Sequence, residues 1–158
     1  MPDPIAPLND TISQVCFVTD DLDALIARMR ALFGRDPVFV GGSPKGGTSA
    51  AVLEGRNVAT SYRQCLFRFA NIDIEFIEPG PEPSTWRETL DRTGPGFHHI
   101  AIGTRAIGRD LETLGAHGMP VIQTGDYESR DGRYAYVDGI EALGGILELL
   151  ESDKDRER

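Results

Sequence analysis

Apolar and polar positions in the first half of the chain alternate as in strands in some segments and recur at helical spacing in another. These segments predict a strand, a helix and three further strands, in that order. The run 12–19 is rich in β-branched residues and predicts a strand. Leu22, Ile26 and Met29 then recur at helical spacing up to Gly34, which can end a helix. Three further strands are predicted at 37–40, 62–69 and 72–77. Residues 11–79 therefore predict a βαβββ unit.

The same order restarts after a segment rich in Pro and Gly, residues 80–95. Strand 97–103 leads to a helix that contains Ile107, Leu111 and Leu114 and that Gly118 can end. The strands predicted after this helix are 120–123, 134–138 and 145–150. The chain is thus predicted to form one domain, residues 11–151, made of repeats 11–79 and 96–151 joined by linker 80–95. A flexible arm, 1–10, and a charged tail, 152–158, flank this domain, and the run of charges from Glu151 onwards is expected to be solvated.

One stretch within the first repeat, residues 41–48, is dense in Gly and Pro and is interpreted as a hairpin turn or a mobile loop. It lacks the lysine that a phosphate-binding P-loop requires before its final threonine. Nucleotide binding is therefore not predicted from it.

Two pairs of segments resemble one another across the repeats, and they define the candidate site. Residues 12–18 are echoed by 97–102, and residues 74–78 are echoed by 147–151. The repeat makes Gln14, His99, Glu75 and Glu148 equivalent inward positions of a pseudo-symmetric site. A carboxylate between apolar strand residues is costly to bury unless it is paired or binds a metal, so the set predicts a cation site. The alternative, that Glu75 and Glu148 face solvent on one-sided strands, stays open.

Composition and charge narrow the possible classes of protein. A chain of 158 residues with 40% apolar composition can build one domain with a sizeable core. Its net charge of −9 disfavours binding to nucleic acid or to an anionic membrane. The two cysteines, Cys16 and Cys65, lie in apolar runs and are expected to be reduced thiols. Without a signal peptide or an apolar span, the prediction is a cytoplasmic protein with a small-molecule substrate.

Three segments resemble the vicinal oxygen chelate superfamily, which includes glyoxalase I, methylmalonyl-CoA epimerase, extradiol dioxygenases and bleomycin-resistance proteins. These segments are 96–102, 74–79 and 145–151, and the resemblance extends over residues 11–151. The double histidine and the Glu-x-x-Glu-Pro ending are most similar to methylmalonyl-CoA epimerase and its relatives. The resemblance implies an α+β fold in which two βαβββ repeats form a half-open eight-stranded barrel, the glyoxalase-like fold.

The resemblance also implies that Gln14, Glu75, His99 and Glu148 bind a divalent metal ion. The superfamily most often has histidine at the position of Gln14. One nitrogen and three oxygen ligands suit Mg²⁺, Mn²⁺, Co²⁺ or Ni²⁺ better than Zn²⁺. His98 is expected to point to the opposite face of its strand, and with one histidine ligand the set disfavours dioxygenase chemistry.

The reaction that the resemblance implies is that of an isomerase or epimerase. It would remove a proton from the carbon next to a metal-polarised carbonyl of a small activated acyl compound, such as a CoA thioester. Glu148 is the expected base, with Glu75 as the second catalytic carboxylate. A further glutamate of the epimerases is missing from residues 56–62, so either Glu54 or Tyr62 replaces it or the substrate is not methylmalonyl-CoA.

Two other functions, a lyase and a non-catalytic binding protein, remain open. The sequence also predicts how the chain assembles. The chain could be a lyase similar to glyoxalase I, the lactoylglutathione lyase, or a non-catalytic protein that sequesters a small molecule, as bleomycin-resistance relatives do. The open sheet edges of two βαβββ units can be covered by isologous pairing, so a homodimer is expected.

Overall fold

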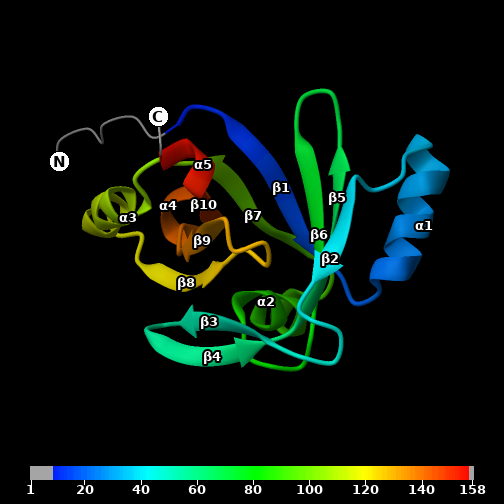
Figure 1. Ribbon diagram of the computed structural model, residues 1–158, viewed down its shortest axis with the longest axis horizontal. Coiled ribbons are helices and arrows are strands. Elements are labelled where there is room, and N and C mark those ends of the chain that lie inside the picture. Colours follow the sequence, from blue (N-terminus) through cyan, green and yellow to red (C-terminus); the bar gives the residue numbers. More distant parts are fainter. Residues whose placement is uncertain (1–8, 157–158) are drawn as a thin grey trace.

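A single strongly curled sheet of ten strands organises the computed structural model, which describes residues 9–156 (Figure 1). The strands are β1 (Ile12–Val18), β2 (Phe39–Gly42), β3 (Ser49–Leu53), β4 (Arg56–Thr60), β5 (Tyr62–Arg68), β6 (Asp73–Pro79), β7 (Gly96–Gly103), β8 (Val121–Asp126), β9 (Gly132–Val137) and β10 (Ile146–Ser152). The helices are α1 (Leu22–Phe33), α2 (Thr85–Thr93), α3 (Ile107–Ala116), α4 (Ile140–Leu143) and α5 (Asp153–Arg156). None of these helices is long and apolar enough to cross a membrane.

The sheet contains the two predicted βαβββ units joined at their first strands. The order of the strands is β2-β5-β6-β1-β7-β10-β9-β8-β3-β4, with β1 antiparallel to β7 at the junction. On each side of the junction, the first strand of a unit pairs in parallel with its last strand, β1 with β6 and β7 with β10. The half-open barrel of two βαβββ repeats predicted from the sequence is confirmed.

The strand count differs from the eight predicted because residues 49–60 form an additional hairpin. Strands β3 and β4 follow β2 in the chain, yet β3 pairs with β8 of the second unit, with Ala51 opposite Gly125 and Leu53 opposite Gln123. The hairpin is held by a partner about 70 residues away in the chain, and no local periodicity could reveal that pairing. It extends the sheet at the end opposite to β2.

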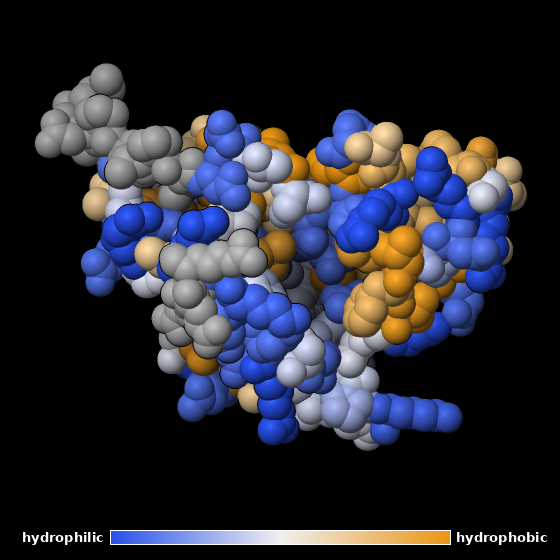
Figure 2. Space-filling model, turned by 45° about the horizontal axis from the view of Figure 1, so that its top comes forward, coloured by the Kyte–Doolittle hydropathy of each residue, from blue (hydrophilic) through white to orange (hydrophobic). Residues whose placement is uncertain are grey.

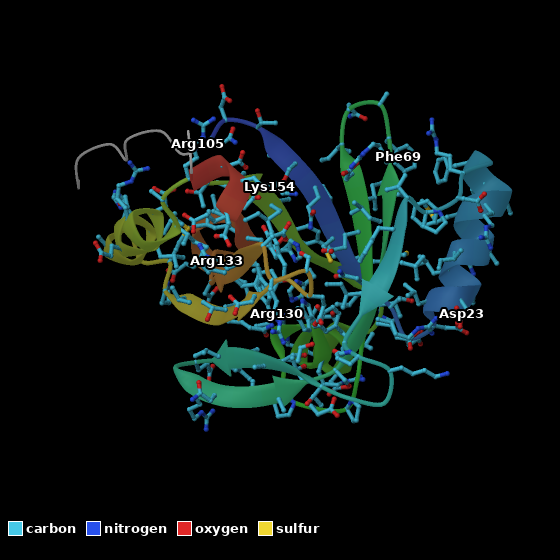
Figure 3. The ribbon with its side chains drawn as sticks, in the orientation of Figure 1. Asp23, Phe69, Arg105, Arg130, Arg133 and Lys154 are labelled. Carbon is cyan, nitrogen blue, oxygen red and sulfur yellow. The ribbon has the colours of Figure 1, made fainter. Side chains whose placement is uncertain are left out.

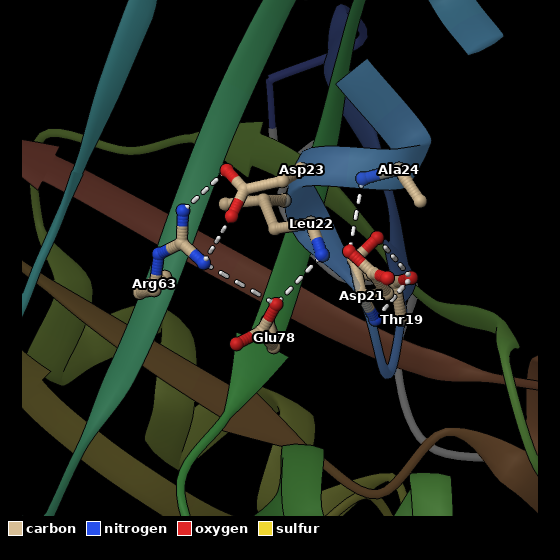
Figure 4. Close-up of polar contacts among 7 residues, drawn as sticks. All are labelled: Thr19, Asp21, Leu22, Asp23, Ala24, Arg63 and Glu78. Atoms are coloured by element: carbon tan, nitrogen blue, oxygen red, sulfur yellow. Dashed lines mark hydrogen bonds and ion pairs between the residues drawn. The ribbon is translucent and has the colours of Figure 1, made fainter. Parts of the chain in front are cut away.

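Helices α1 and α3 cover the outer face of the sheet, one on each unit (Figure 1). The start of α1 is held by Asp21, which accepts a hydrogen bond from the Ala24 amide (2.9 Å), and by Glu78, which accepts one from the Leu22 amide (2.6 Å; Figure 4). In the second unit, Glu151 accepts a hydrogen bond from the Ile107 amide at 3.0 Å. Each repeat therefore uses the last glutamate of its closing strand to fix the start of its helix.

The core inside the curl is built around α2, whose start is capped by Ser84. Trp86, 2% exposed, packs there with Cys16, Val18, Ile77 and Tyr136. Two further apolar clusters lie beneath α1 and α3. The concave face of the sheet is consequently closed at one end by a helix and left partly open elsewhere.

The two ends of the chain match the predicted arm and charged tail only in part. The predicted arm falls mostly on residues 1–8, and part of the tail on 157–158, all outside the described residues. The closing run of charges predicts solvated side chains from Glu151 onwards, and this prediction is wrong for Glu151. Its side chain is fully buried beside Arg133, because β10 continues to Ser152 before α5 begins.

Candidate metal centre and active site

The sheet register brings the four predicted site residues onto the concave face at the junction of the two units. Cys16 of β1 lies opposite Glu75 on one side and His99 on the other. Two residues away, Ala101 lies between Gln14 and Glu148 in the next row across the sheet. Paired residues of neighbouring strands point to the same face, so the two rows stack Gln14 and Glu148 beside Glu75 and His99.

Short distances join these four side chains. The amide nitrogen Nε2 of Gln14 donates to Oε2 of Glu75 at 3.0 Å and to Oε2 of Glu148 at 3.3 Å. The Nε2 atom of His99 lies 2.9 Å from Oε2 of Glu148 and 3.6 Å from Oε2 of Glu75. The ligand atoms of Glu75, His99 and Glu148 all lie within 4.8 Å of one another. One ion could therefore contact both repeats at once.

Burial and charge alter the protonation of the cluster. His99 is fully buried and Glu148 is 4% exposed, whereas the side chain of Glu75 keeps 13% of its surface exposed. Burial, followed by the negative charge of Glu148, raises the pKa of Glu75 to about 7. Burial alone would lower the pKa of His99, but the contact with Glu148 outweighs it and the net direction is upward. Two carboxylates are thus held close together where their joint ionisation is costly without a cation.

The residues present fit a divalent cation. The buried Nε2 atom of His99 makes no well-formed hydrogen bond, although two carboxylate oxygens lie near it. A rotation of the Gln14 amide by half a turn would present its oxygen in place of its nitrogen. The set then offers one imidazole nitrogen and three oxygens, a combination typical of Mg²⁺, Mn²⁺, Co²⁺ or Ni²⁺ sites.

His98 lies on the same face as His99, and the expectation that it points away was wrong. Cys16 is opposite His99 and the next residue, Phe17, is opposite Phe97, so His98 is the extra residue of a β-bulge. A bulge breaks the strict alternation of side chains, which places both imidazoles inside the curl. Their Nδ1 atoms lie 2.8 Å apart. If His99 offers the Nε2 lone pair to a metal, its Nδ1–H donates to His98, which fixes the orientation of the ligand ring.

A cavity of about 350 Å³ opens over the cluster, lined by both carboxylates and by an aromatic wall. The rings in this wall are Tyr62, Trp86, Tyr127, Tyr134 and Tyr136. Trp86 Nε1 donates to the Tyr136 hydroxyl at 3.0 Å, and Gln123 Nε2 donates to the Tyr134 hydroxyl at 3.0 Å, so the rings are fixed. The surface is hollowed between the two halves of the molecule (Figure 2).

The structure distinguishes between Tyr62 and Glu54, the two residues that could replace the glutamate missing from residues 56–62. Tyr62 lines the cavity, and its hydroxyl lies 3.4 Å from Oε1 of Glu128. Glu54 is exposed on the turn between β3 and β4 and pairs with Arg56, outside the residues that line the cavity. Tyr127 also lines the cavity. The sequence could not predict this, because the local pattern around a tyrosine in a turn does not show whether its ring lines a cavity.

The sequence matches a family model over residues 13–137, which is described as the Glyoxalase/Bleomycin resistance protein/Dioxygenase superfamily. The chain belongs to this superfamily. Among curated proteins, it is 26% identical over 92 residues to the uncharacterized protein YqjC of Bacillus subtilis (strain 168), a match that covers 58% of this chain and 66% of that protein.

Solved structures of two methylmalonyl-CoA epimerases share the fold. Methylmalonyl-CoA epimerase from Mycobacterium tuberculosis aligns with a TM-score of 0.67 at 17% identity, over 93% of this chain and 91% of the other. A variant of Streptomyces coelicolor methylmalonyl-CoA epimerase, in complex with 2-nitronate-propionyl-CoA, aligns with a TM-score of 0.67 at 19% identity, over 91% and 95% of the two chains. At these identities the similarity of this chain to the epimerases is one of fold. Its chemistry depends on its own residues.

Proposed function

We propose that this superfamily member is a metal-dependent isomerase or epimerase that removes a proton from the carbon next to the carbonyl of a small activated acyl compound. The convergence of Glu75 and Glu148 on the buried Nε2 of His99, at the base of an open cavity, carries the proposal. Similarity in fold to enzymes named methylmalonyl-CoA epimerase supports it and makes a CoA thioester a reasonable first substrate.

Gln14, Glu75, His99 and Glu148 would hold the divalent ion. A bound ion of this kind supplies Lewis-acid polarisation of the carbonyl oxygen and stabilises the negative charge that develops on it. Mg²⁺, Mn²⁺, Co²⁺ and Ni²⁺ are favoured over Zn²⁺ by the three oxygen donors.

Glu148 is the proposed base and Glu75 the second catalytic carboxylate, and Tyr62, which lines the cavity, is the residue proposed to replace the glutamate missing from residues 56–62. The α-proton would pass to a carboxylate oxygen of Glu148 while the bonding electrons move toward the carbonyl oxygen. Glu75 is proposed to return a proton to the same carbon, which completes the exchange. The aromatic wall would hold the substrate and exclude water from the reacting carbon.

Exchange of the α-proton with solvent deuterium tests the proposal. Purified protein with Mg²⁺ is mixed in D₂O with propionyl-CoA and with methylmalonyl-CoA, and the α-proton signal is followed by NMR. Glu148→Gln should slow the exchange by about 10²-fold or more, since loss of a general base costs at least that much. Glu112→Gln, an exposed change on α3, is the matched control and should leave the rate unchanged. Equal exchange in wild type and Glu148→Gln would contradict the proposed base.

A second candidate function, non-catalytic binding of a small molecule, is favoured by one observation. Gln14 donates hydrogen bonds to both carboxylates, which holds the cluster together without a metal. Metal analysis by plasma emission separates the two functions. The enzyme should bind about one divalent ion per chain and lose it in His99→Ala, whereas the binding protein would contain no metal, bind a ligand and show no exchange.

A further inference from the structure

The cavity over the cluster carries an excess of negative charge. Four carboxylates line it, namely Glu75 and Glu148 at its base and Asp126 and Glu128 on the β8–β9 side. Among the described residues that line it, none is a lysine or an arginine. One divalent ion would balance the charges of Glu75 and Glu148, whereas Asp126 and Glu128, both exposed to solvent, have no basic residue beside them in the lining.

Basic residues near the cavity are directed to other partners or lie outside its lining. Arg63, in the neighbouring hollow, contacts Asp23 at 2.7 Å and Glu78 at 3.6 Å (Figure 4). Arg133 is bound to Glu151 and Asp153. Arg130 belongs to the same turn as Glu128 (Figure 3). It is exposed and is not among the residues that line the cavity. An anionic group inside the cavity would therefore meet carboxylates without a compensating cation.

The aromatic wall is of the kind that attracts positive charge. The centroids of Tyr62 and Trp86 lie 4.8 Å apart, those of Trp86 and Tyr134 6.1 Å apart, and those of Tyr134 and Tyr136 5.1 Å apart. These rings are neighbours within the lining of the cavity, with Trp86 and Tyr136 only 2% and 1% exposed. The faces of such rings are negative, and Trp and Tyr bind ammonium and guanidinium groups well when water is excluded.

We propose that the part of the ligand held in this cavity is an organic cation. An ammonium or guanidinium group would lie beside Asp126 and Glu128, and an apolar segment would follow the aromatic wall toward the carboxylate cluster. For the reacting end, the inference rests on the proposed function, because that function places the carbonyl at Glu75, His99 and Glu148. The same charge distribution disfavours a ligand with a second carboxylate, such as a malonyl group.

Three probes of one skeleton and different charge test the inference: 3-phenylpropylamine, 3-phenylpropanol and 3-phenylpropionate. Binding is measured by isothermal titration calorimetry and by the fluorescence of Trp86, the one tryptophan of the chain, which lies in the wall of the cavity. The amine should bind about tenfold or more tightly than the carboxylate, with the alcohol between them. Glu128→Gln and Asp126→Asn should each reduce this preference several-fold.

Glu112→Gln controls for net charge, because it removes the same charge from an exposed position on α3. It should leave the preference for the amine unchanged. Tighter binding of 3-phenylpropionate would overturn the inference, above all if Arg130→Gln abolished that binding. An equal loss of preference in Glu112→Gln and Glu128→Gln would also overturn it, because the preference would then reflect the charge of the whole molecule.

Titrations with chelator-treated protein and with added Mn²⁺ keep this inference separate from the proposed function. A preference for the amine without deuterium exchange on any acyl-CoA would reject the enzyme and retain the cation site. Exchange on methylmalonyl-CoA together with a preference for 3-phenylpropionate would reject the cation site and retain the enzyme.

Discussion

Glu75 gives the site a pH dependence whose sign follows from its surroundings. Its pKa is raised from 4.5 to about 7 by burial and then by the charge of Glu148. Below a pH of about 4.5 the side chain is protonated in both the folded and the unfolded chain. Between that pH and about 7, the folded chain retains a proton that the unfolded chain has released. The stabilising contribution is therefore fully present in acid and is lost as the pH rises through about 7.

In protein freed of metal, the free energy of unfolding of the wild type relative to Glu75→Gln should fall between about pH 5 and about pH 8. The expected fall is on the order of 3 kcal/mol, the equivalent of moving the pKa from 4.5 to about 7. Urea denaturation at several pH values measures it. A difference between the two proteins that stays constant over this range would contradict a raised pKa at Glu75.

Single residues of the site could be predicted from the sequence where the two repeats resemble each other. The proximity of Gln14, Glu75, His99 and Glu148 could be predicted because each has a counterpart at the same place in the other unit, and the structure brings the four side chains together. His98 could not be placed correctly, since a β-bulge is defined by the register with β1 and leaves no mark on the pattern of one strand.

At the scale of the elements, Glu78 and Glu151 have equivalent positions but different burial. Glu78 accepts a hydrogen bond from the first turn of α1 and keeps 26% of its side-chain surface exposed. Glu151 holds the start of α3, contacts Arg133 and is fully buried. A buried charge that loses its partner costs far more than a partly solvated one.

Glu151→Gln should therefore destabilise the protein by about 2–3 kcal/mol, because Arg133 loses its buried counter-charge but keeps its contact with Asp153. Glu78→Gln should cost about 1–2 kcal/mol, since the amide oxygen can still accept from the Leu22 amide. Chemical denaturation followed by circular dichroism compares the two variants. Equal losses in both would show that burial of Glu151 does not set its contribution.

The elements themselves were predictable where local periodicity is strong. Helix α1 begins and ends as its apolar spacing and Gly34 indicated, and the positive φ of 61° at Gly34 explains the choice of glycine. Strands β3 and β4 were missed because Ser49–Leu53 is short and rich in alanine, and because its pairing with β8 is long-range.

For the whole molecule, the β2 edge of the sheet is the feature that bears on assembly. Val38, Phe39 and Val40 are 55%, 47% and 54% exposed, on or beside an edge strand whose outer side has no partner among the described residues. Natural proteins protect such edges, often by pairing with a second copy. The predicted homodimer would bury this edge.

Light scattering at micromolar and tenfold lower concentration should give the mass of a dimer. Val40→Lys should shift the protein toward the monomer, because a charge on an edge strand opposes pairing. Leu143→Lys adds the same charge at another exposed apolar position, 58% exposed, and should leave the dimer intact. A monomer in the wild type at both concentrations would contradict the predicted assembly.

The β3–β4 hairpin has a consequence for how the chain folds and unfolds. In the chain it belongs to the first repeat, but it extends the sheet of the second, so the sheet of the second repeat is complete only when the first repeat is present. A chain cut within residues 80–95 would yield two fragments that contact each other through β1–β7 and through β3–β8, and refolding would depend on their association. The intact protein should accordingly unfold in one transition, with the fluorescence of Trp86 and the far-ultraviolet circular dichroism changing together, as for a single cooperative unit.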